Sequence, residues 1–265
     1  MERRFYAIEI AYDGGLFRGF QRQPGLPTVQ DALERALGAL GVHAPLAVAA
    51  RTDAGVHALG QVVSFAVRAA LSPEDLRRGL NAALPEGILV LAAHRVAPSF
   101  HARNTALART YVYLLGTPAP EPLRPYAWSL PDARAFPELP EPRLDAGRMC
   151  AALAEAVGTH DFAGFARPGE GRGTVRTVIR AEVVTAAWAP LHAIVIEGRG
   201  FLRAMVRNLV GTAVAAGVGA APAGAVRELI AARARYRGVR APGWGLTLAS
   251  VRYPPGVWPP AEAGR

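Results

Sequence analysis

The feature that most constrains the fold is the order of strand-like and helix-like segments along the chain. Alternating or continuous short apolar runs predict strands, and apolar residues at helical spacing predict helices. Neither half of the 265-residue sequence shows the regular strand–helix–strand alternation of a doubly wound parallel sheet. We therefore predict an α+β fold with two related α/β halves. Each half would have a largely antiparallel sheet flanked by helices, and the active-site cleft would lie between them.

The predicted elements divide the chain into two parts with a Pro-rich connection. The predicted strands are 4–12, 46–50, 61–67, 88–96, 107–115, 176–187, 191–197 and 246–253. The predicted helices span about 28–40, 72–84, 145–157, 202–218 and 223–235. Thr28 and Asp145 are expected helix caps, because their side-chain oxygens can accept from the free N–H groups of a first turn. Residues 117–143 have little periodicity, so the expected division is 1–116, the connection 117–143, and 144–265.

The composition favours a polyanionic partner. The formal net charge is +9, and all thirty basic residues are arginine. GC-rich coding can explain the missing lysines but not the excess of positive charge. A guanidinium group donates paired hydrogen bonds to phosphate and stays charged. The arginines that could contact such a partner, and that could equally be solvated surface charges, are Arg22, Arg77, Arg78, Arg167 and Arg172.

Several classes of protein are excluded or disfavoured. A single cysteine, Cys150, rules out a disulfide framework and a cysteine-built metal site. His160 and Asp161 form no recognisable metal set with other ligands, and the missing lysine argues against a Walker phosphate-binding loop. The uncharged stretch 209–226 is rich in Gly and Ala, so we expect a core helix rather than a membrane span. The N-terminus enters a strand pattern without a signal-peptide apolar region, which predicts a cytoplasmic protein.

Residues 49–57 contain the most informative polar cluster. An apolar run ends at Arg51, and alternation along a strand places Arg51 and Asp53 on the same side. Gly55 then allows a sharp turn. A ligand at the end of this strand could reach both charges, although an Asp before Ala-Gly can also be an ordinary turn residue.

Taken together, short motifs along nearly the whole chain resemble the TruA family of tRNA pseudouridine synthases. They include Tyr-Asp-Gly at 12–14, Gly-Phe-Gln at 19–21, Arg-Thr-Asp-Ala-Gly-Val-His at 51–57 and Phe-His-Ala-Arg at 100–103. Further matches are Arg-Thr-Tyr at 109–111, Gly-Thr-His-Asp-Phe at 158–162, Phe201, Met-Val-Arg-Asn at 205–208, Ala-Pro at 241–242 and Gly-Leu at 245–246. The ordered combination is specific, whereas no single motif would be.

The resemblance implies isomerisation of uridine to pseudouridine at positions 38, 39 and 40, in the anticodon stem-loop of tRNA. Asp53 takes the place of the catalytic aspartate, and Arg207 that of the arginine that pairs with it. Arg51 matches a residue linked to displacing the target base, and Tyr111 matches the tyrosine that lies against the uracil. Family members need no metal or organic cofactor and act as homodimers. The motif also makes Thr52 and His57 candidate substrate contacts, although His57 alone reads as a hydrogen-bonded structural group.

Two other functions fit the same residues. A non-catalytic RNA-binding protein would have the same basic charge, but would gain nothing from a carboxylate in a phosphate-binding groove. A small-molecule enzyme such as a sugar isomerase would owe its charge to codon bias and would show no salt-sensitive binding of tRNA.

Overall fold

The chain forms two compact units. Unit 1 comprises residues 1–109 and 248–265, and unit 2 comprises residues 110–247. The computed structural model describes residues 3–68, 71–130, 135–139, 143–166, 173–232 and 238–259. Unit 1 is thus discontinuous in sequence, unlike the expected segments 1–116 and 144–265. The return of the last strand to the N-terminal unit is a long-range pairing, which local periodicity does not reveal.

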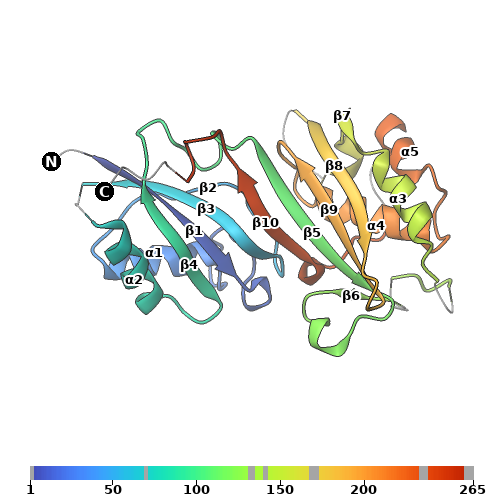
Figure 1. Ribbon diagram of the computed structural model, residues 1–265, viewed down its shortest axis with the longest axis horizontal. Coiled ribbons are helices and arrows are strands. Elements are labelled where there is room, and N and C mark those ends of the chain that lie inside the picture. Colours follow the sequence, from blue (N-terminus) through green and yellow to red (C-terminus); the bar gives the residue numbers. More distant parts are fainter. Residues whose placement is uncertain are drawn as a thin grey trace. The chain divides into compact units, whose positions relative to one another are not determined.

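Unit 1 is built on antiparallel strands. Strand β1 (Arg4–Tyr12) pairs on one side with β3 (His57–Val67) and on the other with β4 (Ile88–Arg95). The short strand β2 (Ala47–Val48) also pairs with β3, and β10 (Leu246–Arg252) lies next to β3 in the sheet order. Helices α1 (Val29–Ala39) and α2 (Pro73–Ala83) complete the unit, together with the 3-10 turn η1 (Gly14–Leu16) (Figure 1).

The helices of unit 1 begin where the sequence predicts. The side chain of Thr28 accepts from the backbone N–H of Asp31, and that of Ser72 accepts from the backbone N–H of Asp75. The buried face of α1 repeats at helical spacing and packs its apolar residues into the core, as amphipathic helices do. These buried residues are Val29, Ala32, Leu33, Ala36 and Leu37.

Unit 2 contains the strand order β5-β9-β8-β7, with β5 at Ala108–Gly116, β9 at Leu191–Gly198, β8 at Val175–Thr185 and β7 at Gly158–Asp161. The pairs β7–β8 and β8–β9 are antiparallel, and the short strand β6 (Trp128–Ser129) runs parallel to β5. Its helices are α3 (Ala146–Ala154), α4 (Met205–Gly217) and α5 (Ala225–Ala232). The 3-10 turn η2 (Glu121–Leu123) lies between β5 and β6, η3 (Ala163–Phe165) between β7 and β8, and η4 (Gly243–Gly245) between α5 and β10.

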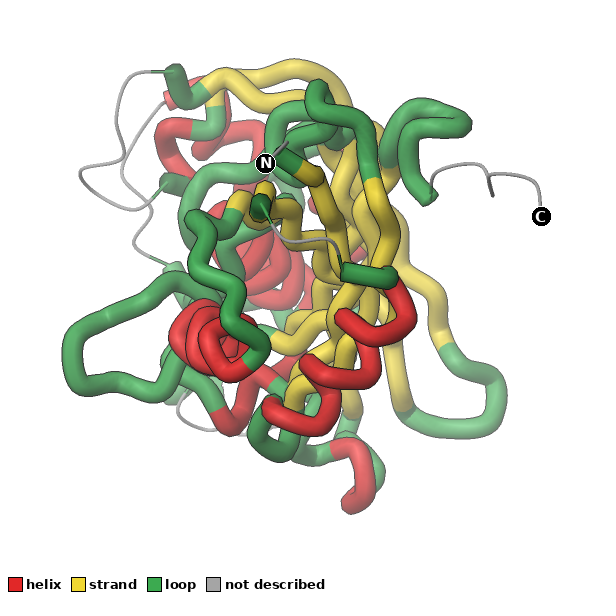
Figure 2. The backbone as a smooth tube through the Cα atoms, turned by 90° about the vertical axis from the view of Figure 1, so that its left-hand side faces the viewer, coloured by secondary structure: helices red, strands yellow, loops and turns green. Residues whose placement is uncertain are grey.

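The prediction of an α+β fold with a largely antiparallel sheet flanked by helices is confirmed (Figure 2). The stretch 209–226 contains most of α4, which is buried along almost its whole length, as expected for a core helix. Over the described ranges, none of the helices has the length and apolar character needed to cross a membrane.

Candidate active site

The candidate active-site loop leaves the sheet just after β2. The backbone N–H of Ala49 donates to the Val62 carbonyl at 2.9 Å, which extends the ladder between β2 and β3 by one residue. At Ala50 the backbone hydrogen bonds are made to the side chain of Gln61 instead of to the backbone of the neighbouring strand. The Gln61 carboxamide accepts from the Ala50 N–H at 3.2 Å and donates to the Ala50 carbonyl at 2.7 Å. The chain then runs through residues 51–56, of which the first three are polar, and enters β3 at His57.

A hydroxyl pair holds the next part of the loop. The hydroxyl oxygens of Tyr12 and Thr52 lie 2.7 Å apart, and the Gln61 amide also donates to Tyr12 at 3.3 Å. Burial raises the pKa of Tyr12 to about 12, and its hydrogen bonds with Thr52 and Gln61 only partly oppose this shift. The phenol therefore stays protonated at neutral pH and can act as a donor.

Two glycines allow the segment after β1 to wrap closely around the loop. A Cβ added at Gly14 would lie 2.1 Å from the Val56 carbonyl oxygen, and one at Gly19 would lie 3.0 Å from the Thr52 carbonyl oxygen. Gly19 also has a φ of +95°, which favours glycine. The backbone N–H of Phe20 donates to the Thr52 carbonyl at 3.1 Å. The motifs at 12–20 and 51–57 are therefore neighbours in space.

The two charged residues predicted to act on a ligand are accessible. Arg51 is exposed, whereas Asp53 is partly buried and its carbonyl accepts from the Val56 N–H at 3.2 Å. Thr52, which lies between them, is 7 % exposed. The loop thus buries Thr52 while leaving both charges within reach of a ligand.

His57 is buried and bonded to the loop after β1. Its Nδ1 accepts from the Gly14 N–H at 3.1 Å and lies 3.1 Å from Asp13 Oδ1. The backbone N–H of Gly14 can only donate, so Nδ1 is the acceptor in this contact. This geometry suits a structural group better than a substrate contact.

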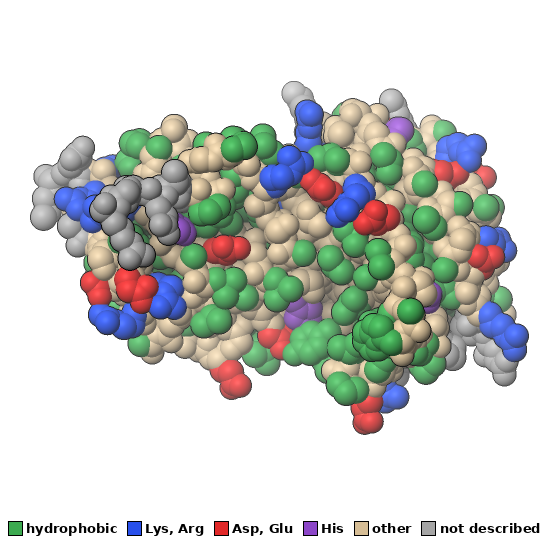
Figure 3. All heavy atoms as spheres, in the orientation of Figure 1, with side chains coloured by type: hydrophobic (Ala, Val, Ile, Leu, Met, Phe, Trp, Pro, Cys, Tyr) green, Lys and Arg blue, Asp and Glu red, His purple; other side chains and the backbone are tan. Residues whose placement is uncertain are grey.

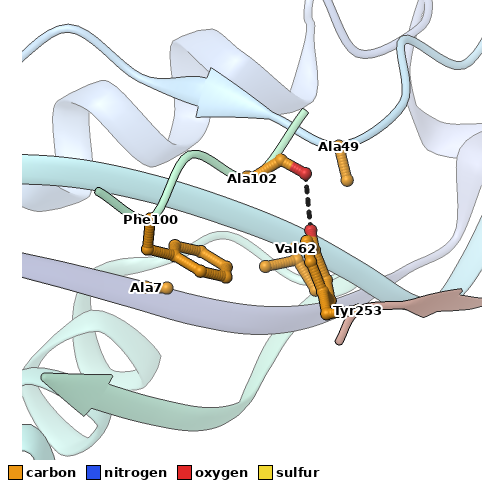
Figure 4. Close-up of a cluster of buried hydrophobic side chains, with 6 residues drawn as sticks. All are labelled: Ala7, Ala49, Val62, Phe100, Ala102 and Tyr253. Carbon is orange, nitrogen blue, oxygen red and sulfur yellow. Dashed lines mark hydrogen bonds between the residues drawn. The ribbon is translucent and has the colours of Figure 1, made fainter. Parts of the chain in front are cut away.

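Arg109 is a buried residue that the sequence analysis noted only as part of a motif. Its Nε and Nη2 both donate to the Ala49 carbonyl, at 3.2 and 2.9 Å, and Nη2 also donates to the Arg103 carbonyl at 2.7 Å. Ala49 belongs to a small core cluster with Phe100 and Tyr253, in which the Tyr253 hydroxyl donates to the Ala102 carbonyl (Figure 4). This cluster supports the strand that leads into the candidate loop.

Tyr111 and Arg207 lie in unit 2, whereas Arg51, Thr52, Asp53 and His57 lie in unit 1. The Tyr111 ring is 7 % exposed and meets the Phe201 ring edge-on, with centroids 5.4 Å apart. Arg207 lies in the first turn of α4, and its Nε donates to the Ala241 carbonyl at 2.7 Å. Its charge also opposes the rise that burial imposes on the pKa of Tyr113. The expected pairing of Arg207 with Asp53 stays a prediction.

The candidate RNA-binding arginines that the structure describes all face carboxylates. Arg22 pairs with Asp31 and Glu34, Arg77 pairs with Glu74, and Arg78 pairs with Asp75. Exposed pairs of this kind contribute little to stability. They matter here for RNA binding, because each carboxylate cancels the positive charge of the arginine that it faces. Arg167 and Arg172 lie outside the described residues.

Among the described residues, no group of three or more His, Cys, Asp or Glu side chains is placed to hold a metal ion. Cys150 is exposed on α3.

Comparison with known proteins identifies the family. The family model described as tRNA pseudouridine synthase matches residues 9–103 and 152–254, which include Asp53 and Arg207. The chain belongs to the tRNA pseudouridine synthase family. It is therefore an enzyme of the isomerase class, and the resemblance inferred from the ordered motifs is confirmed.

The curated relatives of this synthase match it over almost its full length. tRNA pseudouridine synthase A of Streptococcus thermophilus (strain CNRZ 1066) is 38% identical over 254 residues, which cover 94% of this chain and 98% of the relative. The protein of that name from Solibacter usitatus is 39% identical, covering 93% of this chain and 98% of its own. The one from Neisseria meningitidis serogroup B is 40% identical, covering 96% and 93%.

Proposed function

We propose that this synthase converts uridine to pseudouridine at positions 38, 39 and 40, in the anticodon stem-loop of tRNA. Asp53 would be the catalytic group, and no metal or organic cofactor would be needed. The observation that carries the proposal is the loop of residues 51–56. It holds Arg51 and Asp53 accessible in a chain whose relatives are named tRNA pseudouridine synthase A.

The reaction moves the glycosidic bond from N1 to C5 of uracil. If Asp53 attacks C1′, its carboxylate oxygen bonds to that carbon while the N1–C1′ bond breaks and uracil leaves as an anion. After the base rotates, C5 attacks C1′ and displaces the carboxylate. C5 then loses its proton, and N1 gains one. In the alternative route, the Asp53 carboxylate adds to C6 and the C5=C6 double bond becomes an enolate. The N1–C1′ bond then breaks, C5 bonds to C1′, and N1 gains a proton. C5 finally loses its proton as the C6–O bond to Asp53 breaks and the double bond re-forms. Both routes release the C5 hydrogen to solvent.

The other candidate residues fit supporting roles. An arginine paired with Asp53 would hold the carboxylate ionised against desolvation, and we propose Arg207 for this role from the family resemblance. A cation in the first turn of α4 is unfavourable to the helix dipole, so a nearby anion would compensate for this placement. Tyr111 would cover the uracil and exclude water while the base is detached. Stacking on a ring is worth roughly 1–3 kcal/mol per base.

Arg51 would occupy the space left when the target base leaves the stem, or would grip the phosphate beside it. Extruding a base costs a few kcal/mol, which such a contact could offset. The buried side chains of Thr52 and His57 are bonded to Tyr12 and Gly14, so we propose that these two motif residues hold the loop in place rather than contact the substrate. From the same resemblance we propose that the enzyme works as a homodimer in the cytoplasm, and sedimentation of the purified protein tests the first part.

The decisive experiment measures tritium release from an unmodified tRNA transcript labelled with [5-³H]uridine. We expect release by the wild type and none by Asp53→Asn, with tRNA affinity preserved within about tenfold. The control Asp75→Asn removes an exposed carboxylate on α2 and should release tritium normally. Equal release by wild type and Asp53→Asn would remove Asp53 from the mechanism. Binding without release by either protein would favour the RNA-binding alternative.

A further inference from the structure

Two buried side chains hold the residues on either side of Arg51, Ala50 through its backbone and Thr52 through its hydroxyl. The Gln61 carboxamide bonds both the N–H and the carbonyl of Ala50, and the Tyr12 hydroxyl meets Thr52 Oγ1. Gln61 is completely buried, and Tyr12 is 5 % exposed. A carboxamide presents one donor edge and one acceptor, as a neighbouring strand does. Gln61 therefore continues the ladder for one residue beyond the point where the backbones of β2 and β3 separate.

The hydrogen-bond pattern fixes the orientation of the Gln61 carboxamide. The Ala50 N–H can only donate, so the Gln61 oxygen faces it and the Gln61 NH2 group faces the Ala50 carbonyl and Tyr12. Tyr12 therefore accepts from Gln61. Its own buried O–H needs an acceptor, and Thr52 Oγ1 lies 2.7 Å away. The chain of donors thus runs from Gln61 through Tyr12 to Thr52.

We propose that Gln61 and Tyr12 are positioning residues that set the direction of the Asp53 side chain. This inference rests on the catalytic role proposed for Asp53. Residues 50 and 52 are anchored, so the backbone dihedrals that lead into Asp53 have little freedom. Neither Gln61 nor Tyr12 needs to touch the substrate for this effect. Losing either anchor should therefore misplace the carboxylate without removing a contact to tRNA.

Asn81 offers a matched control for Gln61. Its carboxamide donates to the Val90 carbonyl at 3.0 Å and accepts from the Val90 N–H at 2.7 Å. The same two-sided clamp thus joins α2 to β4, two elements that carry none of Arg51, Thr52 and Asp53. Replacing Asn81 by Leu should destabilise the fold without altering the geometry of the loop 51–56.

The experiment compares single-turnover rate, tRNA affinity and thermal stability for Gln61→Met, Tyr12→Phe and Asn81→Leu. We expect Gln61→Met and Tyr12→Phe to lower the rate by about tenfold to 100-fold, the range typical of small misplacements, at nearly unchanged affinity. Asn81→Leu should lower the melting temperature at an unchanged rate. The double variant Gln61→Met/Tyr12→Phe should lose less than the product of the single losses, because both side chains act on one segment.

A second pair of variants keeps the test decisive if Gln61→Met does not fold. Thr52→Val removes the acceptor for Tyr12 and should lose as much rate as Tyr12→Phe, whereas Thr52→Ser keeps it and should lose less. Wild-type rates in Gln61→Met and Tyr12→Phe would overturn the inference, as would an equal rate loss in Asn81→Leu. Measuring Asp53→Asn in the same assay separates the two proposals, because normal turnover there would instead overturn the role of Asp53.

Discussion

At the scale of single residues, Glu9 is a carboxyl group whose burial opposes its charge. It lies on β1 opposite Val62 and Ala92, and burial raises its pKa above the ordinary value. The folded state then binds the Glu9 proton more tightly than the unfolded chain. Stability from this group is present at low pH and is lost as pH rises from the unfolded pKa through the folded one.

We therefore expect Glu9→Gln to unfold at higher urea concentration than the wild type at pH 7.5. The advantage should shrink as pH falls and vanish where Glu9 is protonated in both states. The exposed Glu138 provides the control, since Glu138→Gln should leave stability unchanged at both pH values. A constant gain for Glu9→Gln across the pH range would contradict the assignment to ionisation.

Some residues of the candidate site could be predicted from the sequence alone, and others could not. Strand alternation and a turn glycine were enough to indicate that Arg51 and Asp53 lie at an accessible loop. Gln61 and Arg109 could not be found in this way, because each acts by bonding the backbone of a residue in another segment of the chain. Side-chain hydrogen bonds to the backbone leave no periodic signal in the sequence. Gln61 therefore looks like an ordinary polar residue in a mostly apolar strand.

At the scale of elements, helix α4 has no room for a side chain at Gly211, because another backbone segment passes close to it. A Cβ there would lie 1.8 Å from the Val239 carbonyl oxygen, which belongs to the backbone and cannot rotate away. We expect Gly211→Ala to destabilise the protein by about 1–3 kcal/mol, because overpacking exceeds the gain of about 1 kcal/mol in helix propensity. Urea unfolding measures the change. On α1, Gly38→Ala would meet only His43 at 3.4 Å and should be neutral or stabilising.

Some helices and strands begin at other residues than predicted, because the local backbone conformation, and not the apolar pattern, sets their ends. The helix predicted at 202–218 begins at Met205, because Ala204 adopts a left-handed conformation with φ of 62°. The strand predicted from residue 61 begins at His57, so part of the family motif is itself strand. Strand β6 was missed because two residues, one of them the buried Trp128, are too short to show alternation.

At the scale of the whole molecule, net charge predicts strongly salt-dependent binding of tRNA. Basic and acidic side chains lie next to one another on the face in Figure 3, so local pairing decides which arginines contribute. Arg22 and Arg35 face Asp31 and Glu34, and the pairs of α2 cancel likewise. The excess of nine positive charges must therefore come from other positions.

Filter binding at several salt concentrations tests this distribution. Each phosphate contact contributes about 0.7 to 0.9 to the slope of log affinity against log salt. We expect Arg77→Gln and Arg78→Gln to leave the slope unchanged, because those guanidinium groups are already neutralised by Glu74 and Asp75. We propose from the sequence that Arg167 and Arg172 contact the tRNA backbone, so Arg167→Gln and Arg172→Gln should each lower the slope by about one contact. A lower slope for the α2 variants would show that tRNA displaces these carboxylates. An unchanged slope for the variants at 167 and 172 would remove both arginines from the RNA-binding surface.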